Sequence, residues 1–512
     1  MSGLKINTFK TEGKWVGSLR NNKSKPFGIK WSGEPIKALG VYYSYDTKLL
    51  HEKNFIERLD SVKKLVNLWS SRGLTVYGKV TVIKSLIIPK FVYILSLLPA
   101  PKEIVQELNR ILFKFLWKGT DKVTLRLSTI NEYENGGLKM IDLESTIKSL
   151  RLAWLKRIFG ENNGAWKSYL RVSLKRYGGL FLFIATMILK IIMFPLFFYS
   201  ELLQWWSEFR DSYDTKKEWQ HIVWNNKEIR INNKPIFYGT LFENGIIYVN
   251  DLLFDTDTAD SFEVISGKIG KTNFLTWAGL RHSVPLHLKI KESSPSEMSL
   301  LVTIDNKDFD VLKRNSKDYY TLIKSSKAKL PNNSQYLRQT FNLAEDHLKK
   351  VFWLPHKVSF EPYIKAFQYK VLNSILFTNT KLFKIGYISE DKCSFCKLEP
   401  ESPHHLLFHC SLVRPFWKDF EYYFYLLTRE FVHLTLQDVM TGIIYANYCL
   451  LNYLILVAKL YIWDCRRNLT PIISAFKLKV KLKYETEKLI CAKNNNMDKF
   501  NKKWDLCMGS VH

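Results

Sequence analysis

Apolar residues are spaced as in strands near the N-terminus and as in helices after about residue 45. Residues 1–45 hold short runs such as GIKW and IKALGVYYSY that are broken by glycines, a pattern typical of strands joined by turns. From Asn54, apolar residues recur every three or four positions, which predicts an amphipathic helix. Its stripe consists of Phe55, Leu59, Val62, Leu65, Val66 and Trp69. We therefore predict a small antiparallel sheet ending in a hairpin, then this helix and two more, over residues 74–98 and from Lys102 to Trp117.

The middle of the chain has a weaker pattern. Apolar and polar residues alternate from 229 to 236 around an Asn-Asn pair, which predicts strands or a hairpin. Residues 303–334 are rich in Asn, Ser and Lys and are predicted to form a linker. The apolar stretch 178–200 is interrupted by Lys190 and Pro195, and its pieces are shorter than the roughly 20 residues that span a bilayer. A buried helix is therefore favoured there over a membrane span.

The C-terminal third returns to a helical pattern from Tyr336. Residues 364–386 predict an amphipathic helix followed by a turn, and the aromatic and aliphatic residues from 421 to 466 predict two packed helices. The basic stretch that begins at Phe476 is either an RNA-contacting arm or a solvated terminus. Together the patterns predict a multi-domain α+β chain that is predominantly helical.

One short segment concentrates residues that bind metals. It holds four candidate ligands in the spacing C-x2-C-x8-H-x4-C, namely Cys393, Cys396, His405 and Cys410. Structural zinc sites use four tetrahedral sulfur or imidazole ligands, and two intervening residues let one tight turn direct both cysteine sulfurs at a single point. Residues 399–403, with two prolines, are predicted to form an exposed loop. We call residues 393–410 the knuckle and predict that it binds zinc; the alternative is three buried cysteines without a metal.

Three histidines in the knuckle could supply the imidazole. His405 and His409 lie one turn apart on a short helix, so either could face the metal, whereas the neighbouring His404 points elsewhere. His405 leaves a gap of four residues before Cys410, enough for one turn to bring both donors to the ion. His409 is the immediate neighbour of Cys410 and is sterically a poor partner for it. We therefore choose His405.

Composition and charge narrow the class of partner. A chain of 512 residues is too long for one hydrophobic core, so about two to four domains are expected. The formal net charge is +28, and residues 1–157 carry 28 Lys plus Arg against 13 Asp plus Glu, a net of 28 − 13 = +15. More than half of the excess charge thus lies in the first third. Nucleic acid is the leading partner, because each phosphate neutralised releases condensed counterions, and a membrane surface is the second possibility.

The cysteines indicate a reducing compartment. Three of the seven lie in the knuckle, and the other four are scattered, unlike a secreted disulfide scaffold. The N-terminus has no signal-peptide pattern, because lysine or arginine recurs every few residues without an apolar stretch between them. We expect a location in the nucleus, the cytoplasm or both, without a transmembrane helix.

Several segments follow one another in a specific order. They are SGLKINTFKTE and IKALGV in the first 45 residues, W-x2-R-x-LT-x2-GK-x3-IK from Trp69 to Lys84, IPKFVY at 88–93, FKFLW at 113–117, and ENGGLKMIDLESTIKSLRLAWLKRI at 134–158. In this order they resemble the region after the catalytic palm core in reverse transcriptases of LINE-type non-LTR retrotransposons. The knuckle, with its LLFHC run and the following Phe416 and Trp417, resembles the zinc-binding domain of the same polyproteins.

The resemblance implies a division of the chain and a set of nucleic-acid contacts. It implies the end of the palm over 1–45, a helical thumb over 46–125, a connector over 126–335, the zinc-binding domain over 336–425, and a C-terminal helical region with a basic tail over 426–512. The expected partners are RNA, an RNA–DNA hybrid or nicked target DNA. The thumb residues expected to contact phosphates are Lys63, Lys64, Lys79, Lys84 and Lys90.

The sequence departs from the family at the chemistry of polymerisation. Polymerases use carboxylates that hold two Mg²⁺ ions, and in this family the paired aspartates lie just upstream of the SGLKIN segment. The present sequence contains no Asp-Asp pair and begins after that place. We assign no catalytic residue, expect magnesium only together with a palm, and do not expect the chain alone to polymerise DNA. The alternative is a host-type zinc-containing protein that binds RNA or DNA and has no polymerase ancestry.

Overall fold

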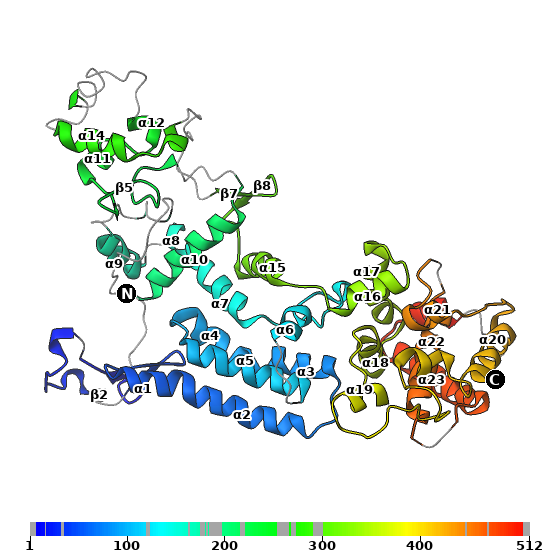
Figure 1. Ribbon diagram of the computed structural model, residues 1–512. Helices are drawn as coiled ribbons and strands as arrows, with labels where there is room; N and C mark the ends of the chain where they lie inside the picture. The colour runs from blue at the N-terminus through cyan, green and yellow to red at the C-terminus, as the bar shows by residue number, and fades with distance from the viewer. Residues whose placement is uncertain are drawn as a thin grey trace. The chain divides into compact units, whose positions relative to one another are not determined.

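The structure is a computed structural model, shown in Figure 1. It describes residues 7–15, 17–31, 35–118, 123–161, 164–174, 180, 183, 197–215, 221–252, 266–267, 273–289, 301–445, 448–467 and 470–504. Most of the stretch 178–200, predicted to be a buried helix, lies outside these residues.

The chain divides into two compact units, and it contributes three segments to each. Unit 1 consists of Met1–Arg58, Lys90–Gln106 and Asp142–Ser326. Unit 2 consists of Leu59–Pro89, Glu107–Ile141 and Lys327–His512, and it contains the whole knuckle.

Four short strands form the β element near the N-terminus. Strands β3 (Ile36–Ala38) and β4 (Val41–Tyr43) pair in antiparallel fashion, which confirms the predicted hairpin. Strands β1 (Glu12–Gly13) and β2 (Lys30–Trp31) instead pair in parallel, so the prediction of a wholly antiparallel sheet is wrong at this point. Two 3-10 turns lie between β1 and β2, and they return the chain so that both strands run in the same direction.

A run of helices follows the strands. These are α1 (Thr47–His51), α2 (Glu57–Ser70), α3 (Val76–Val82), α4 (Pro89–Leu97), α5 (Lys102–Trp117) and α6 (Val123–Thr129). Asp46 caps α1, because its carboxylate accepts hydrogen bonds from the backbone N–H groups of Lys48 and Leu49. Four of the six predicted stripe residues in and before α2 are buried, which confirms the helical period. The helix predicted over 74–98 is divided by a π-helical turn, after which Pro89 begins α4.

Unit 1 has an aromatic core, and the cation Arg151 is buried in this unit. Its remaining helices are α7 (Leu143–Leu152), α8 (Trp154–Phe159), α9 (Ala165–Leu174), α10 (Phe197–Tyr213), α11 (Gly239–Glu243), α12 (Val249–Leu252), α14 (Phe274–Ser283) and α15 (Ser316–Lys327). Arg151 on α7 is fully buried, pairs with Glu201 at 2.9 Å, and donates to the carbonyl oxygens of Ser96 and Leu98 at 3.4 and 2.8 Å. Arg151 therefore satisfies carbonyl groups at the end of α4 that the helix itself leaves without partners.

Two hairpins in unit 1 turn on residues with positive φ. Strands β5 (Arg230–Ile231) and β6 (Lys234–Pro235) are joined by Asn232 and Asn233, at φ of 51° and 59°. Asparagine tolerates this left-handed conformation better than most residues, and two-residue hairpins require it. The hairpin predicted around the Asn-Asn pair is confirmed.

The second hairpin corrects the prediction of a linker over 303–334. Strands β7 (Leu301–Ile304) and β8 (Lys307–Asp310) pair through all four positions, with Asp305 and Asn306 in the turn at positive φ. Helix α15 follows directly. The Asp, Asn and Lys residues of this stretch belong to a tight turn and to a solvated helix face, and these produce the same polar composition as a linker.

Unit 2 has one large core around a central helix. Its C-terminal helices are α16 (Asn333–Thr340), α17 (Glu345–Val358), α18 (Pro362–Leu372), α19 (Asn379–Lys384), α20 (Arg414–Thr428), α21 (Leu436–Thr441), α22 (Cys449–Cys465), α23 (Ile473–Lys493) and α24 (Met497–Trp504). Figure 1 shows α17, α18, α21 and α23 next to α22, and thirteen of the 17 residues of α22 are buried. One continuous cluster of buried side chains runs from Leu337 to Trp504 and includes Cys393 and Cys410 of the knuckle. The knuckle is therefore part of this core.

The predicted fold class, a predominantly helical α+β chain with small β elements, is confirmed. In the part of the chain that the structure describes, no single helix has the length and apolar character to cross a membrane. The pair Val76–Ile87 and Pro89–Leu97 meets the criteria of length and composition only when taken together, across a bend of 47°.

Gly442 tests how tightly the core of unit 2 is packed. It follows α21 with a φ of +82°, and a Cβ atom at this position would overlap Cδ2 of Leu354 on α17. We predict that Gly442→Ala lowers the free energy of unfolding by at least about 2 kcal/mol, because backbone strain and overpacking add. Urea unfolding followed by circular dichroism measures the change. Gly73→Ala is the control, since a Cβ there meets no atom within 4 Å, and equal effects of the two substitutions would contradict the packing described.

Candidate metal centre

The knuckle is built from a turn and a short helix. Lys397 has a φ of 57°, and its N–H donates to the carbonyl oxygen of Cys393 at 3.0 Å, which closes the turn that carries Cys393 and Cys396. His405 begins a single π-helical turn, and the N–H of Cys410 donates back to the His405 carbonyl oxygen at 2.8 Å. The two ligand pairs are thus each held by one local backbone hydrogen bond.

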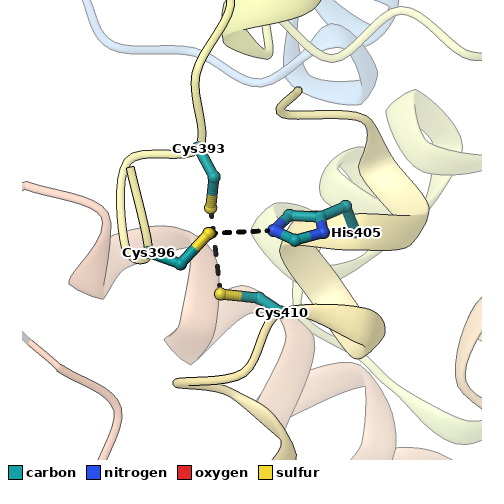
Figure 2. A group of neighbouring side chains, drawn as sticks. All are labelled: Cys393, Cys396, His405 and Cys410. Carbon is teal, nitrogen blue, oxygen red and sulfur yellow. Dashed lines mark hydrogen bonds between the residues drawn. The ribbon is translucent and has the colours of Figure 1, made fainter. Parts of the chain in front are cut away.

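The four candidate side chains converge on one point, as Figure 2 shows. Their ligand atoms all lie within 4.8 Å of one another. The Sγ atoms of Cys393 and Cys410 are 3.9 Å apart, and the Sγ atom of Cys396 is 3.4 Å from Nε2 of His405. With zinc bond lengths of about 2.3 Å to sulfur and about 2.0 Å to nitrogen, a tetrahedral ion separates two sulfurs by about 3.8 Å and a sulfur from a nitrogen by about 3.5 Å. The donor set therefore fits Zn²⁺ in both chemistry and spacing.

The structure distinguishes the three histidines of the knuckle. His405 is buried and faces the cysteines, whereas His409 is exposed. His404 packs instead against the rings of Tyr336 and Phe341, at 6.1 and 6.0 Å between centroids. Among the three, the geometry supports His405 as the imidazole ligand.

The three thiols differ in their affinity for protons. Burial raises the pKa of Cys393 to about 12 and also raises the pKa of Cys410. Burial also acts to raise the pKa of Cys396. Hydrogen bonds from the backbone N–H groups of Glu399 and Leu398 stabilise its thiolate and outweigh the effect of burial, so that the pKa of Cys396 is lowered to about 6. A bound Zn²⁺ ion would need all three as thiolates, so zinc binding would release protons, chiefly from the two buried cysteines.

A carboxylate lies next to the ring nitrogen of His405 that faces away from the cysteines. The Glu399 carboxylate lies 2.9 Å from Nδ1 of His405, close enough for an ion pair, although its direction does not give Nδ1 a well-aligned hydrogen bond. Carboxylates in this position commonly orient a metal-binding histidine. Since Nε2 is the nitrogen that faces Cys396, the arrangement leaves that atom available to a metal.

A second carboxylate, that of Glu401, connects the knuckle to the rest of unit 2 through hydrogen bonds and an ion pair. It is fully buried, and its two oxygens accept from the backbone N–H groups of Asn379 at 2.9 Å and Ser394 at 2.6 Å. Arg466, just after α22, pairs with it at 2.6 Å and also donates to the hydroxyl of Ser394 at 3.0 Å. The prediction that residues 399–403 form an exposed loop is therefore wrong for Glu401. The sequence offers no signal for this role, because its partner Arg466 is distant along the chain.

Lys79, one of the five lysines expected to contact phosphates, is not at the surface. Its side chain is buried, and Nζ donates to the carbonyl oxygens of Phe115 and Leu116 at 2.8 and 3.2 Å. Burial, together with the charges of Lys118 and Lys370, lowers its pKa to about 8. Lys79 satisfies carbonyl groups at the end of α5, so we do not include it among the proposed phosphate contacts.

The other four lysines are exposed. Lys63 and Lys64 lie on α2, where Lys63 also pairs with Asp60 at 3.2 Å. Lys84 lies on the π-helical turn between α3 and α4, and Lys90 lies at the start of α4. Lys63, Lys64 and Lys84 belong to unit 2 and Lys90 to unit 1, so only the first three form a set within one unit.

Two comparisons with known proteins bear on the origin of this chain. Residues 332–417, which include all four candidate ligands, match the family described as zinc-binding in reverse transcriptase. This segment is similar to a reverse-transcriptase zinc-binding domain. Over 170 residues the chain is also 28% identical to the "Transposon TX1 uncharacterized 149 kDa protein" of Xenopus laevis. The matched part is 32% of this chain and only 13% of that protein. The resemblance to the C-terminal region of a non-LTR retrotransposon reverse transcriptase is confirmed.

The choice of histidine in the zinc-binding domain can be tested directly. We predict that the purified chain carries one zinc ion, that His405→Ala loses most of it, and that His409→Ala retains it, because only His405 faces the three sulfurs. Elemental analysis of both variants after dialysis against metal-free buffer measures the zinc content. Retention of zinc by His405→Ala together with loss by His409→Ala would show that the ligand set is wrong.

Glu401 should affect how tightly zinc is bound. We predict that Glu401→Gln weakens zinc binding about tenfold, a typical effect of losing an outer polar contact, because the amide cannot accept from both N–H groups and leaves Arg466 without its ion pair. Competition with a fluorescent chelator measures the affinity. Glu390→Gln, which removes an exposed carboxylate close to the same loop, is the matched control. Equal affinities of the two variants would mean that the knuckle is held without Glu401.

Proposed function

We propose that this chain is the nucleic-acid-binding C-terminal part of a non-LTR retrotransposon reverse transcriptase. Its partner in this proposal is RNA, an RNA–DNA hybrid or nicked target DNA. The observation that carries the proposal is a reverse-transcriptase zinc-binding domain, with its four ligands assembled, in a chain of net charge +28. A charge of this size favours binding to phosphates through counterion release.

In this proposal zinc has a structural role. All four positions of a tetrahedral ion would be filled by Cys393, Cys396, His405 and Cys410, which leaves no open position for water or substrate. The ion would hold the knuckle loop in place on the core of unit 2, and exposed lysines of that unit would contact the nucleic acid. The polymerase step itself would need a pair of magnesium-binding aspartates, which this sequence does not contain.

The proposal assigns the thumb contacts to exposed lysines. Within unit 2 these are Lys63 and Lys64 on α2 and Lys84 on the π-helical turn before α4. Such contacts hold the sugar–phosphate backbone and carry no sequence information. Binding should therefore depend strongly on salt and weakly on sequence.

The test is a salt series with the full chain. We predict that it binds RNA and an RNA–DNA hybrid with a steep loss of affinity as salt rises. Replacing Lys63, Lys64 and Lys84 together by alanine should reduce the slope of log affinity against log salt by about 2 to 3, since each phosphate contact contributes about 0.7 to 0.9. Fluorescence anisotropy with labelled nucleic acids measures both quantities.

A charge-matched variant controls for the loss of three positive charges. Lys307, Lys313 and Lys317 are exposed lysines of unit 1, and their replacement by alanine should change the slope by much less. Equal slopes for the two triple variants would contradict the assigned contacts. Absence of binding by the zinc-loaded wild-type chain at moderate salt would overturn the proposed function itself.

A further inference from the structure

Unit 2 contains a pocket that the zinc centre does not use. It has a volume of about 480 Å³ and lies between α17 and the segment that leads into α22. Pockets of this size are large enough for a small organic ligand. Its lining is mixed. Apolar side chains such as Leu354 and Val358 lie beside polar or aromatic ones, namely Lys350, Trp353, Lys357, Tyr445, Tyr448 and Asn452.

The wall opposite α17 is held in a defined conformation. The side chain of Asn452 on α22 makes two hydrogen bonds to Ile443, accepting from its N–H at 2.8 Å and donating to its carbonyl oxygen at 2.9 Å. Thr435 and Asp438 form a capping box that fixes the start of α21 just before this wall. These contacts fix the position of Ile443 in the wall without a ligand.

One face of α17 presents a cation on each side of an aromatic ring. Lys350, Trp353 and Lys357 are separated by three and four residues, so they share one face of the helix over two turns, about 10.5 Å along its axis. Within the described residues neither Lys350 nor Lys357 forms an ion pair, whereas the adjacent Lys349 pairs with carboxylates on its own helix at 3.6 and 3.9 Å. The two positive charges that line the pocket are thus not neutralised by a carboxylate.

The aromatic rings at the pocket are both exposed and supported. Trp353 is 37% exposed and stacks on His356, with 5.6 Å between centroids and 19° between planes. His356 in turn stacks on Tyr133 at 4.1 Å. Tyr445 is 66% exposed, and its ring is held edge-on against His347 at 5.0 Å. An indole and a phenol, each fixed by a neighbouring ring, therefore remain accessible at the pocket.

We propose that this pocket binds one unpaired nucleotide of a single-stranded RNA or DNA. Base–aromatic stacking on Trp353 and Tyr445 would hold the base, and Lys350 and Lys357 would hold the phosphates on either side of it. Bases stack on protein aromatic rings irrespective of sequence, and flanking cations follow the backbone. A purely apolar peptide would leave both lysines without partners, so it fits the pocket less well. The inference rests on the proposed function and deepens it, because it adds a site for an unpaired base to the proposed backbone contacts of the exposed lysines.

The experiment compares single strands with duplexes. Anisotropy with the full chain measures binding of a labelled oligouridine and of a blunt RNA duplex of the same length. Trp353→Ala should weaken binding of the oligouridine by about 5- to 100-fold and leave duplex binding unchanged, since only unpaired bases can stack in the pocket. Trp353→Phe should retain most of the single-strand affinity. Tyr422→Ala, which removes an aromatic ring that is 62% exposed on α20, is the matched control and should change neither affinity.

The lysines supply an independent readout in salt dependence. Lys350→Ala should reduce the salt slope for the oligouridine by about 0.7, and Lys349→Ala, its paired neighbour on the same helix, should leave it unchanged. Zinc content and thermal unfolding of each variant establish that it is folded. If the wild type binds both probes and Trp353→Ala weakens neither, or both equally, the pocket does not bind a base, while the proposed function stands. If the wild type binds neither probe, the proposed function fails first.

Discussion

The requirement that four ligand atoms meet within the bonding distance of one ion organises the C-terminal half of this protein. The Sγ atoms of Cys393 and Cys410 are 3.9 Å apart even though 16 residues separate them in the sequence, and both side chains are buried in the same core as α22. Two short backbone motifs bring the ligands together, and the surrounding core holds the motifs. The zinc centre and the hydrophobic core are thus one structural unit, so losing the metal would also loosen the packing around it.

Buried charges mark the positions where separate segments are joined. Glu401 and Arg466 link the knuckle to the end of α22, and Arg151 with Glu201 links α4, α7 and α10 in the other unit. The two fully buried members, Glu401 and Arg151, are each paired and also hydrogen-bonded to backbone groups, which offsets the cost of removing them from water. Such pairs contribute little net stability compared with apolar packing. They do oppose alternative arrangements, because shifting one segment would leave a buried charge without its partner.

The lysines of unit 2 lie in two different environments. Lys79 and Lys459 are buried, and their Nζ atoms satisfy carbonyl or amide oxygens inside unit 2. Lys63, Lys64 and Lys84 are exposed, and they are the residues that we propose contact a phosphate backbone. Net charge therefore indicates the class of partner, but it does not identify the contacts, since a lysine that completes a helix end looks the same in the sequence as one that binds a phosphate.

The sequence by itself determined the features that depend on local spacing. The C-x2-C-x8-H-x4-C pattern identified the four candidate ligands that the structure brings together. The apolar period located α2 and α5, and the Asn-Asn pair located a hairpin. Each of these features depends on residues that are close together in the chain. Only the tertiary structure decided the features that depend on distant residues. Among these are the burial of Glu401 against Arg466, the burial of Lys79 beneath the end of α5, and the pocket between α17 and the start of α22. The hairpin of residues 301–310 depends on both kinds of information. Its turn residues are visible in the sequence, but a linker has the same composition, and only the pairing of the two strands distinguishes a hairpin from a linker.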